Sequence, residues 1–403
     1  MKSIPYGRQN ITDEDIQEVV SVLKGEYLTQ GPKILEFEEA FAEYVDAKYA
    51  VACANGTAAL HLCTLALGVS EGDKVITTPI TFAASANCVR YCGGEVVFCD
   101  IDSQSYLLDL EKVRGVLSKS PKGTFKGIIP VDFAGKAVDM EAFRKLADEY
   151  GMWIIEDACH APGGFFTDQA GTRQKCGNGQ LADVAIFSFH PVKHIAAGEG
   201  GMITTNDEAI YQKLLMLRSH GITRDQKNFE NEVSFASSGQ SIPNSSEYPG
   251  WYMEMQTLGY NYRITDFQAA LGLSQLKRAD EGLARRKQIA KRYDEAFFDH
   301  SQVKSQLNEL GSSSSGHAYH LYVIKTQNRL GLYNYLREHF VFTQVHYIPT
   351  HLMPYYRSSG WKEEDLPVAE AYYKECLSLP MYPTLTDSEQ DYVIDKIKNY
   401  FIA

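Results

Sequence analysis

The chain has 403 residues, with 39 Lys or Arg against 51 Asp or Glu, so its formal net charge is −12. This acidic balance argues against a nucleic-acid partner, because affinity for a phosphate backbone depends on clustered basic side chains. No apolar run of about 18 residues is present, so no membrane span is predicted. The eight cysteines are scattered without a C-x-x-C pair, which is typical of reduced thiols in a cytoplasmic protein.

Short apolar segments alternate with helical segments along the first 220 residues. Expected strands cover 49–53, 74–77, 95–100, 127–132, 153–156, 183–187 and 202–205, and expected helices cover 57–67, 140–150 and 207–219. Strands that alternate with helices imply crossover connections and a mainly parallel sheet. Such a sheet binds its ligands beyond the carboxyl ends of its strands, so candidate residues are sought there.

The rest of the chain departs from this rhythm. Residues 224–250 form a polar stretch that is expected to be a long loop, and loops of that length are usually functional. A long helix is expected over 265–298, followed by a surface turn at the GSSSSG segment, residues 311–316. A strand over 319–326, a helix near 329–339 and a strand near 343–347 then complete a smaller unit. We therefore expect a large α/β domain over 1–255 and a smaller α+β domain over 256–403.

The first candidate for chemistry is Lys193, which follows an expected strand and the Ser188 hydroxyl. A lysine just beyond a strand end faces the open edge of the sheet, and a neutral amine there can form a Schiff base. Most single loop lysines only face solvent, but the neighbours of Lys193 favour chemistry. They include a glycine cluster that allows close backbone approach, namely Gly198, Gly200 and Gly201.

Two further segments lie at strand ends of the same sheet. Asp157 follows the strand 153–156, where an acid can pair with the protonated ring nitrogen of pyridoxal phosphate (PLP); its alternative role is a cap on the next turn. His160 is expected to steady that carboxylate or to lie over the ring. The segment 55–59 opens a helix after the strand 49–53, and it predicts either a phosphate site or an ordinary N-cap. A phosphate site, an acid and a lysine in this order are the parts of a PLP enzyme.

Ordered motifs along nearly the whole chain resemble the DegT/DnrJ/EryC1/StrS family of sugar aminotransferases. The motifs are found at 28–32, 56–59, 78–82, 156–160, 187–201, 259–263, 345–347 and 377–380. The resemblance implies an α/β enzyme of PLP-dependent transferase fold type I, similar to aspartate aminotransferase. Its large domain would hold a mainly parallel sheet, followed by the smaller C-terminal α+β domain.

The resemblance also implies a role for each matching position. Lys193 would bond covalently to PLP, Asp157 would pair with the pyridine nitrogen, and Phe82 would stack on the ring. Phosphate contacts are implied for Gly56, Thr57, Ala58, Ser188 and, reaching across a homodimer with shared active sites, Asn261. The implied substrate-binding positions are Tyr6, Glu26, Tyr27, Leu28, Thr29, His346, Tyr347, Ile348 and Pro349.

Residues 187–193 and 218–221 are most similar to the pseudaminic acid branch of the family. This similarity implies transfer of an amino group from L-glutamate to C4 of a UDP-linked keto-sugar, UDP-2-acetamido-2,6-dideoxy-β-L-arabino-hex-4-ulose. Two positions depart from many relatives: His160 stands in place of Gln, and Asp132 stands in place of His. The alternatives are another nucleotide-linked keto-sugar or a non-catalytic regulatory member. A dehydratase branch, in which His replaces the lysine, is disfavoured by Lys193.

Metal and dinucleotide sites are not expected. His190 and His194 stand four residues apart, but no Glu accompanies them in an H-E-x-x-H pattern, and the other histidine pairs are expected in strands or loops. Residues 177–182 mimic a G-x-G-x-x-A fingerprint. The polar residues 173–176 before them are not expected to form the strand that a dinucleotide site requires.

Overall fold

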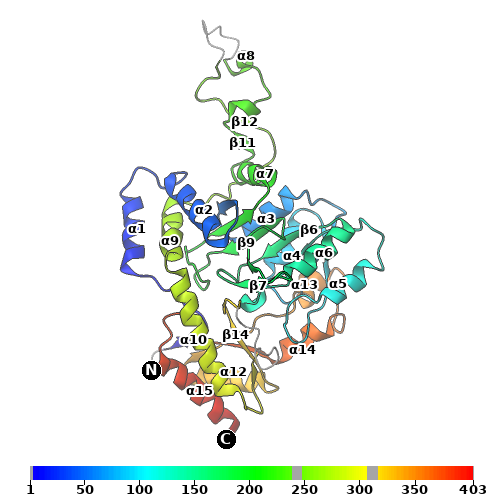
Figure 1. Ribbon diagram of the computed structural model, residues 1–403, viewed down its shortest axis with the longest axis vertical. Helices are drawn as coiled ribbons and strands as arrows, with labels where there is room; N and C mark the ends of the chain where they lie inside the picture. Colours follow the sequence, from blue (N-terminus) through cyan, green and yellow to red (C-terminus); the bar gives the residue numbers. More distant parts are fainter. Residues whose placement is uncertain (1–2, 238–246, 306–315, 403) are drawn as a thin grey trace.

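The computed structural model describes residues 3–237, 247–305 and 316–402. Its centre is a seven-stranded sheet in the order β2-β10-β9-β6-β5-β3-β4 (Figure 1). Only β10 runs antiparallel to its neighbours, so the expectation of a mainly parallel sheet is confirmed. The strands are β2 (Tyr49–Cys53), β3 (Lys74–Thr77), β4 (Glu95–Phe98), β5 (Phe125–Ile129), β6 (Trp153–Asp157), β9 (Val184–Ser188) and β10 (Gly201–Thr205).

Helices cover this sheet because its strands are apolar on both faces. All five residues of β10 are buried, as are four of the five in β6. The covering helices are α2 (Pro32–Val45), α3 (Gly56–Ala66), α4 (Ala84–Tyr91), α5 (Leu110–Leu117), α6 (Met140–Tyr150) and α7 (Glu208–Arg218). Helix α6 has the bounds that its sequence predicts: Asp139 caps its start, and Gly151 ends it with a φ of 69°.

The single helix expected over 265–298 is wrong. The structure has α9 (Asp266–Leu276) and α10 (Ala279–Phe297), with Arg278 between them at a φ of −113°. The Arg278 guanidinium donates to the buried carboxylate of Asp15 in α1 (Asp13–Leu23) at 2.5 Å. The break between the helices therefore coincides with a contact between two residues 263 positions apart in the sequence. Helical periodicity is a local pattern and cannot predict such a contact.

The smaller C-terminal unit packs around its own apolar cluster and holds both chain ends (Figure 1). It contains β13 (Lys304–Ser305), β14 (Tyr322–Lys325), β16 (Cys376–Leu379), α12 (Arg329–Glu338) and α15 (Asp387–Ile402). Helices α13 (Pro354–Arg357) and α14 (Pro367–Glu375) lie between these elements in the sequence, but their buried residues Tyr356, Ala369 and Tyr372 belong to the core of the large domain. Strand β1 (Ile4–Pro5) pairs with β15 (Val341–Phe342), so the strand near 343–347 is wrong in position. Of those later residues, Gln344 forms a single antiparallel bridge with Ser378 of β16, and His346 and Tyr347 lie in a loop.

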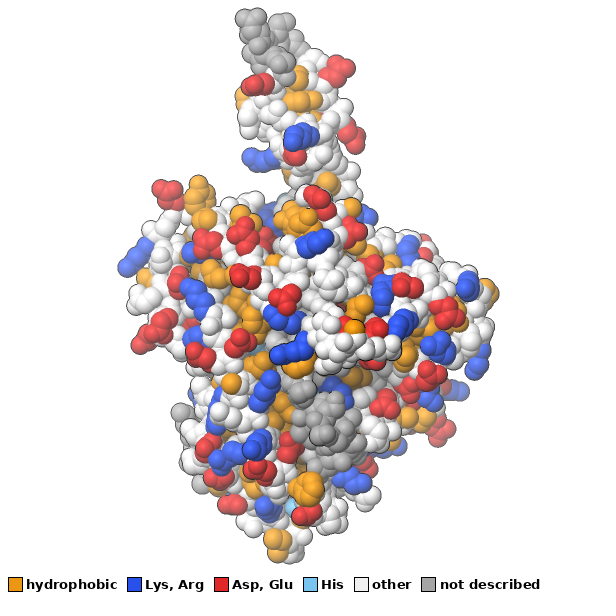
Figure 2. All heavy atoms as spheres, in the orientation of Figure 1, with side chains coloured by type: hydrophobic (Ala, Val, Ile, Leu, Met, Phe, Trp, Pro, Cys, Tyr) orange, Lys and Arg blue, Asp and Glu red, His pale blue; other side chains and the backbone are white. Residues whose placement is uncertain are grey.

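The described residues of the polar stretch form an arm that projects from the body in Figures 1 and 2. It contains β11 (Ile222–Thr223), α8 (Val233–Ala236) and β12 (Glu254–Met255). The Glu254 carboxylate accepts hydrogen bonds from the backbone of Glu230 and Asn231 and from the Tyr252 hydroxyl. Burial alone would raise the pKa of Glu254, but these bonds lower it to about 2. The tip, 238–246, and most of the expected turn at 311–316 lie outside the described residues.

Within the described ranges, no helix has both the length and the apolar character that crossing a membrane requires.

Candidate active site

The reversed strand β10 brings two distant segments together at one edge of the sheet. Its first residue, Gly201, pairs with Cys53 at the end of β2 and with Ser188 at the end of β9. The contact is so close that a Cβ on Gly201 would lie 2.5 Å from the carbonyl oxygen of Asn55. A Cβ on Gly56 would likewise lie 3.0 Å from the Cβ atom of Ser188. The segments that follow β2 and β9 therefore form one cradle.

The cradle has the features of a phosphate site. The Asn55 side chain accepts the Ala58 amide hydrogen at 2.8 Å and so caps helix α3. Among the described residues, no acceptor faces the amides of Gly56 and Thr57, which belong to the first turn of this helix. The N-terminus of a helix attracts anions through such free N–H groups, so the residues present fit a phosphate group.

Asp157 ends β6 at the same edge and is 5% exposed. Its carboxylate accepts hydrogen bonds from the Ser85 hydroxyl at 2.6 Å and from the Cys159 amide at 3.2 Å. The Ser85 hydroxyl also contacts that of Thr81 at 2.8 Å. These donors stabilise a charged, oriented acid, which is what a protonated ring nitrogen requires. Ser85 was not predicted as a site residue from the sequence, although it lies one helical turn beyond the 78–82 motif.

Lys193 is half-buried, and its Nζ lies 3.4 Å from Nε2 of His320. Burial lowers the pKa of Lys193, and the nearby Asp157 carboxylate opposes that shift. A neutral amine in this place is a usable nucleophile and base. His320 was expected only as a strand or loop residue. Its contact with Lys193 joins residues 127 positions apart, and no local sequence pattern indicates such a contact.

His160 is 4% exposed and has a defined hydrogen-bond pattern. Its Nδ1 accepts the Ala134 amide hydrogen at 3.2 Å, so the neutral ring carries its hydrogen on Nε2 and donates to the Tyr347 hydroxyl at 3.2 Å. Burial, together with the Lys193 charge, holds the pKa of His160 well below its ordinary value. Burial also raises the pKa of Tyr347, which therefore stays a neutral phenol.

His346 interacts with the same lysine, and Tyr6 packs against His346. Their rings are 5.1 Å apart, and Nδ1 of His346 lies 2.8 Å from the Ser378 hydroxyl. Burial, with the Lys193 charge, lowers the pKa of His346 to about 3. A Cβ on Gly7 would lie 3.4 Å from that of Val192, so the N-terminal segment reaches the residue before Lys193.

The other sequence-predicted residues are mostly exposed, and no contact within the described residues joins them to Lys193. Phe82 is 64% exposed, and the segment 26–29 is exposed throughout. Thr29 of that segment bridges to Thr265, and the exposed Asn261 bridges to Ser219 at the base of the arm. Ile348 is also exposed, whereas Pro349 is buried. These residues present a surface rather than a closed site.

A second buried group of titratable residues lies next to Asp157. Oxygens of Asp132 and Glu156 and the sulfur of Cys176 lie within 4.8 Å of one another. Burial raises the pKa of Asp132 to about 7, and burial with the Asp132 charge raises the pKa of Glu156 well above its ordinary value. Two carboxyl groups this close share a proton, because both cannot ionise together.

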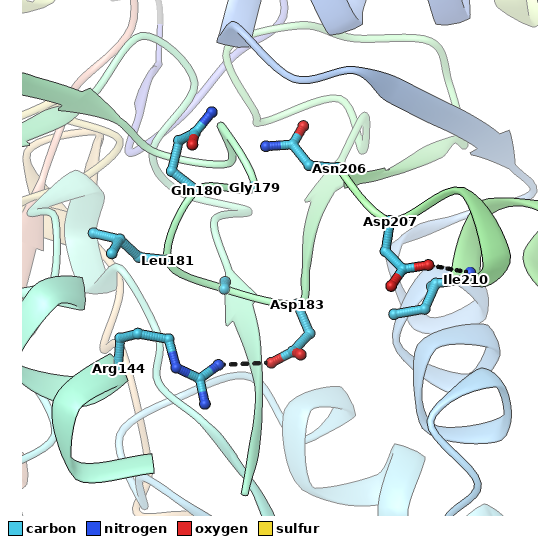
Figure 3. A pocket seen from close by; sticks show the side chains of 9 residues that line it. Arg144, Gly179, Gln180, Leu181, Asp183, Asn206, Asp207 and Ile210 are labelled. Atoms are coloured by element: carbon cyan, nitrogen blue, oxygen red, sulfur yellow. Dashed lines mark hydrogen bonds and ion pairs between the residues drawn. The ribbon is translucent and has the colours of Figure 1, made fainter. Parts of the chain in front are cut away.

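A shallow pocket lies at the opposite edge of the sheet (Figure 3). Arg144 points to Asp183, just before β9, and donates to it at 2.9 Å, while Asn206 follows the end of β10. The pocket includes part of the segment 177–182 that mimics a G-x-G-x-x-A fingerprint. The prediction that no strand precedes this segment is wrong. Residues 173–175 form β8 (Arg173–Lys175), which pairs only with β7 (Phe165–Thr167). The mimic leads into β9 rather than into a helix, so it lacks the helix N-terminus of a dinucleotide site.

The sequence pattern of the DegT/DnrJ/EryC1/StrS aminotransferase family matches residues 9–398. The chain is 37% identical over 404 residues to the spore coat polysaccharide biosynthesis protein SpsC of Bacillus subtilis, covering 98% of this chain and 96% of that protein. It is 34% identical over 396 residues to the UDP-4-amino-4,6-dideoxy-N-acetyl-beta-L-altrosamine transaminase of Campylobacter jejuni, with the same coverage. A solved structure of Helicobacter pylori PseC, an aminotransferase involved in the biosynthesis of pseudoaminic acid, matches with a TM-score of 0.85, 29% identity and 100% coverage of both chains.

These matches confirm the fold type, the aminotransferase activity and the dependence on PLP that the sequence predicts. Because the family pattern spans almost the whole chain and the relatives exceed 30% identity, the protein belongs to the DegT/DnrJ/EryC1/StrS aminotransferase family.

Proposed function

We propose that the protein transfers the amino group of L-glutamate to C4 of UDP-2-acetamido-2,6-dideoxy-β-L-arabino-hex-4-ulose, in the biosynthesis of pseudaminic acid or a related cell-surface amino sugar. The observation that carries this proposal is the convergence of the Gly56 cradle, Asp157 and Lys193 at one sheet edge. The likeness to the Campylobacter transaminase and to PseC supports the choice of sugar.

The residues present fit PLP as follows. The amides of Gly56 and Thr57 and the Ser188 hydroxyl would hold its phosphate, with Ala58 lining the same turn, and Asp157 would hold its ring nitrogen protonated. His160 would lie beside the ring, as its position next to Lys193 and Tyr347 allows. When bound, PLP supplies an electron sink for the carbon that loses a proton.

Lys193 is the proposed general base and acid. Its neutral amine would take the proton from the α-carbon of glutamate. Water would supply the keto oxygen of 2-oxoglutarate, which would leave, while the amino group would stay with PLP for the second substrate. In the second half-reaction Lys193 would return a proton to C4 of the sugar. Burial of the lysine, which lowers its pKa, favours the neutral form that the first step requires.

The substrate would lie between the buried wall and the exposed surface. Tyr6, His346 and Tyr347 form the wall beside Lys193, with Ile348 and Pro349 on the same loop. We assign Glu26, Tyr27, Leu28, Thr29 and Asn261 to the site of a partner subunit in a homodimer, with Phe82 stacking on the ring of its own site. Their exposure in the single chain supports this assignment.

The first test is an absorption spectrum of the purified protein with PLP, before and after L-glutamate. A band above about 400 nm that glutamate shifts to shorter wavelength is expected, because a lysine-bound cofactor absorbs there. Lys193→Ala should lose both the band and the activity, whereas Lys291→Ala, at a lysine 78% exposed, should keep both. A protein without a glutamate-sensitive band would favour the regulatory alternative.

The choice of sugar needs its own test. The glutamate-treated protein is offered the proposed UDP-keto-sugar, its C5 epimer and a dTDP-linked 4-keto-6-deoxy sugar. Fastest return of the long-wavelength band with the first compound is expected. Faster return with another keto-sugar would leave the aminotransferase in place and overturn the substrate.

A further inference from the structure

We propose that His320 donates its Nε2 hydrogen to the Lys193 amine, keeps that amine neutral and aims it, and so acts as a further catalytic residue. The proposal rests on the role proposed for Lys193. It is carried by the 3.4 Å contact between the two side-chain nitrogens, which joins a segment of the small unit to the edge of the central sheet.

The ring of His320 is held firmly in this position. It is 4% exposed and lies 4.3 Å from the His160 ring and 5.8 Å from the His194 ring, measured between centroids. The buried Arg286 guanidinium donates to the His320 carbonyl oxygen at 3.3 Å. Because side chain and backbone are both fixed, Nε2 has a single direction to face.

The hydrogen on this ring can be placed by counting partners. Nδ1 of His320 has no hydrogen-bond partner among the described residues, although it is buried. Burial keeps the pKa of His320 well below its ordinary value, so the ring is neutral and carries one hydrogen. A buried N–H without an acceptor is rarer than a buried lone pair without a donor, so the hydrogen belongs on Nε2.

The Nε2–H group of His320 favours the neutral form of Lys193. The titratable and charged groups that interact with Lys193 from the surrounding elements are Asp157, Cys159, His160, His194, His320, His346 and Arg286. Burial raises the pKa of Cys159 well above its ordinary value, so that thiol is neutral, and Asp157 is the one carboxyl group of the set. An N–H aimed at Nζ favours the amine lone pair over an ammonium, and it opposes the attraction of Asp157.

The test measures Lys193 directly in the protein without cofactor. Trace acetic anhydride labels neutral amines, and mass spectrometry follows the Lys193 peptide over a range of pH, with the exposed Lys291 as internal reference. His320→Leu should raise the midpoint of Lys193 labelling by about one pH unit, which makes the amine about tenfold less reactive near neutral pH. His320→Gln places an amide N–H at the same reach and should stay within a few tenths of a unit of the wild type.

Two controls separate this effect from a loss of structure. His317→Leu makes the same exchange in the same segment. His317 accepts the Tyr319 amide hydrogen and, among the described residues, has no contact with Lys193, so the Lys193 midpoint should not move. Circular dichroism melting checks that each variant folds. An unchanged midpoint in His320→Leu, or an equal rise in His320→Gln, would overturn the proposal.

The glutamate half-reaction then provides a second readout in the PLP-loaded protein. Its single-turnover rate should show an alkaline shift of its pH midpoint in His320→Leu and approach the wild-type rate at high pH. A uniform fall at every pH would mean that His320 only supports the fold. If no variant binds PLP, the proposed function fails, while the labelling result still decides the role of His320.

Discussion

At the scale of single residues, Asp132 couples the stability of the fold to pH. Its carboxyl group is 1% exposed, accepts the Val138 amide hydrogen at 2.8 Å and lies beside Glu156. Its pKa is raised to about 7 in the folded chain, whereas in the unfolded chain an Asp ionises near its ordinary value of about 4. The protonated acid therefore favours the fold at low pH, and that contribution is lost as the pH rises through 7.

Asp132→Asn should remove this pH dependence. An amide keeps an oxygen for Val138, places an N–H towards Glu156 and never ionises. We expect its melting temperature to exceed that of the wild type by about 2 °C at pH 8 and the difference to shrink by pH 5, measured by differential scanning calorimetry.

Asp102 is a control whose pKa is shifted in the opposite direction from that of Asp132. Burial raises its pKa, but hydrogen bonds from Ser105 and Gln104 outweigh burial and lower it. Its ionised form therefore supports the fold above the pKa of the unfolded chain, and Asp102→Asn should destabilise the protein at pH 8. An Asp132→Asn protein that is also less stable at pH 8 would contradict the shared-proton description.

At the scale of elements, the arm depends on two glycines at its base. A Cβ on Gly259 would lie 2.0 Å from the backbone nitrogen of Gly221. Gly221 itself has a φ of +69°, and a Cβ there would lie 1.8 Å from the carbonyl oxygen of Thr257. The two backbones touch, so only glycine lets the outgoing and returning chains of the arm leave the body side by side.

Gly259→Ala should therefore loosen the arm without affecting the sheet. Trypsin should cut after Arg224 or Lys227 about tenfold faster, because local opening exposes these bonds. Gly250→Ala is the matched control within the same arm, since a Cβ there meets nothing within 4 Å. Equal cleavage of the two variants would show that the glycine contact does not hold the arm.

Elements and site residues were predictable from sequence to the extent that the signals are local. The buried strands and the capped helix α6 follow from periodicity and end signals within a few residues. The break at Arg278 depends on Asp15, and the contact of Lys193 depends on His320, which are partners that no local pattern registers. The boundary between domains at 255 and 256 stays a prediction, as do the roles of the individual site residues.

At the scale of the whole molecule, the surface predicts a second copy of the chain. Large apolar side chains are exposed near the proposed shared site and at the base of the arm, including Tyr27 at 55%, Phe82 at 64% and Leu258 at 74%. Apolar area of this kind marks a protein interface. Sedimentation should give about 90 kDa, twice the 45.2 kDa chain. Leu258→Asp should shift it towards monomer, whereas Leu330→Asp, equally exposed on α12, should not.

Mixing two inactive variants tests whether the sites are shared. Lys193→Ala and Asn261→Ala each damage every site of their own homodimer. In a mixed dimer, one site combines an intact Lys193 with Asn261 of the partner subunit. Unfolding and refolding the two together should therefore restore about a quarter of the wild-type activity. No recovery, together with a normal mixed dimer by mass, would place Asn261 in its own subunit's site.

The reversed strand β10 also affects how the protein is made. Among the described strands, β2 pairs with β10 alone, yet Gly201 lies 148 positions after Cys53 in the sequence. At about 5 to 20 residues per second, the ribosome needs roughly 7 to 30 seconds to supply that partner. Throughout this interval the apolar β2 has an unpaired edge that chaperones must protect. Translation halted before Gly201 would thus leave an aggregation-prone fragment without a cofactor cradle.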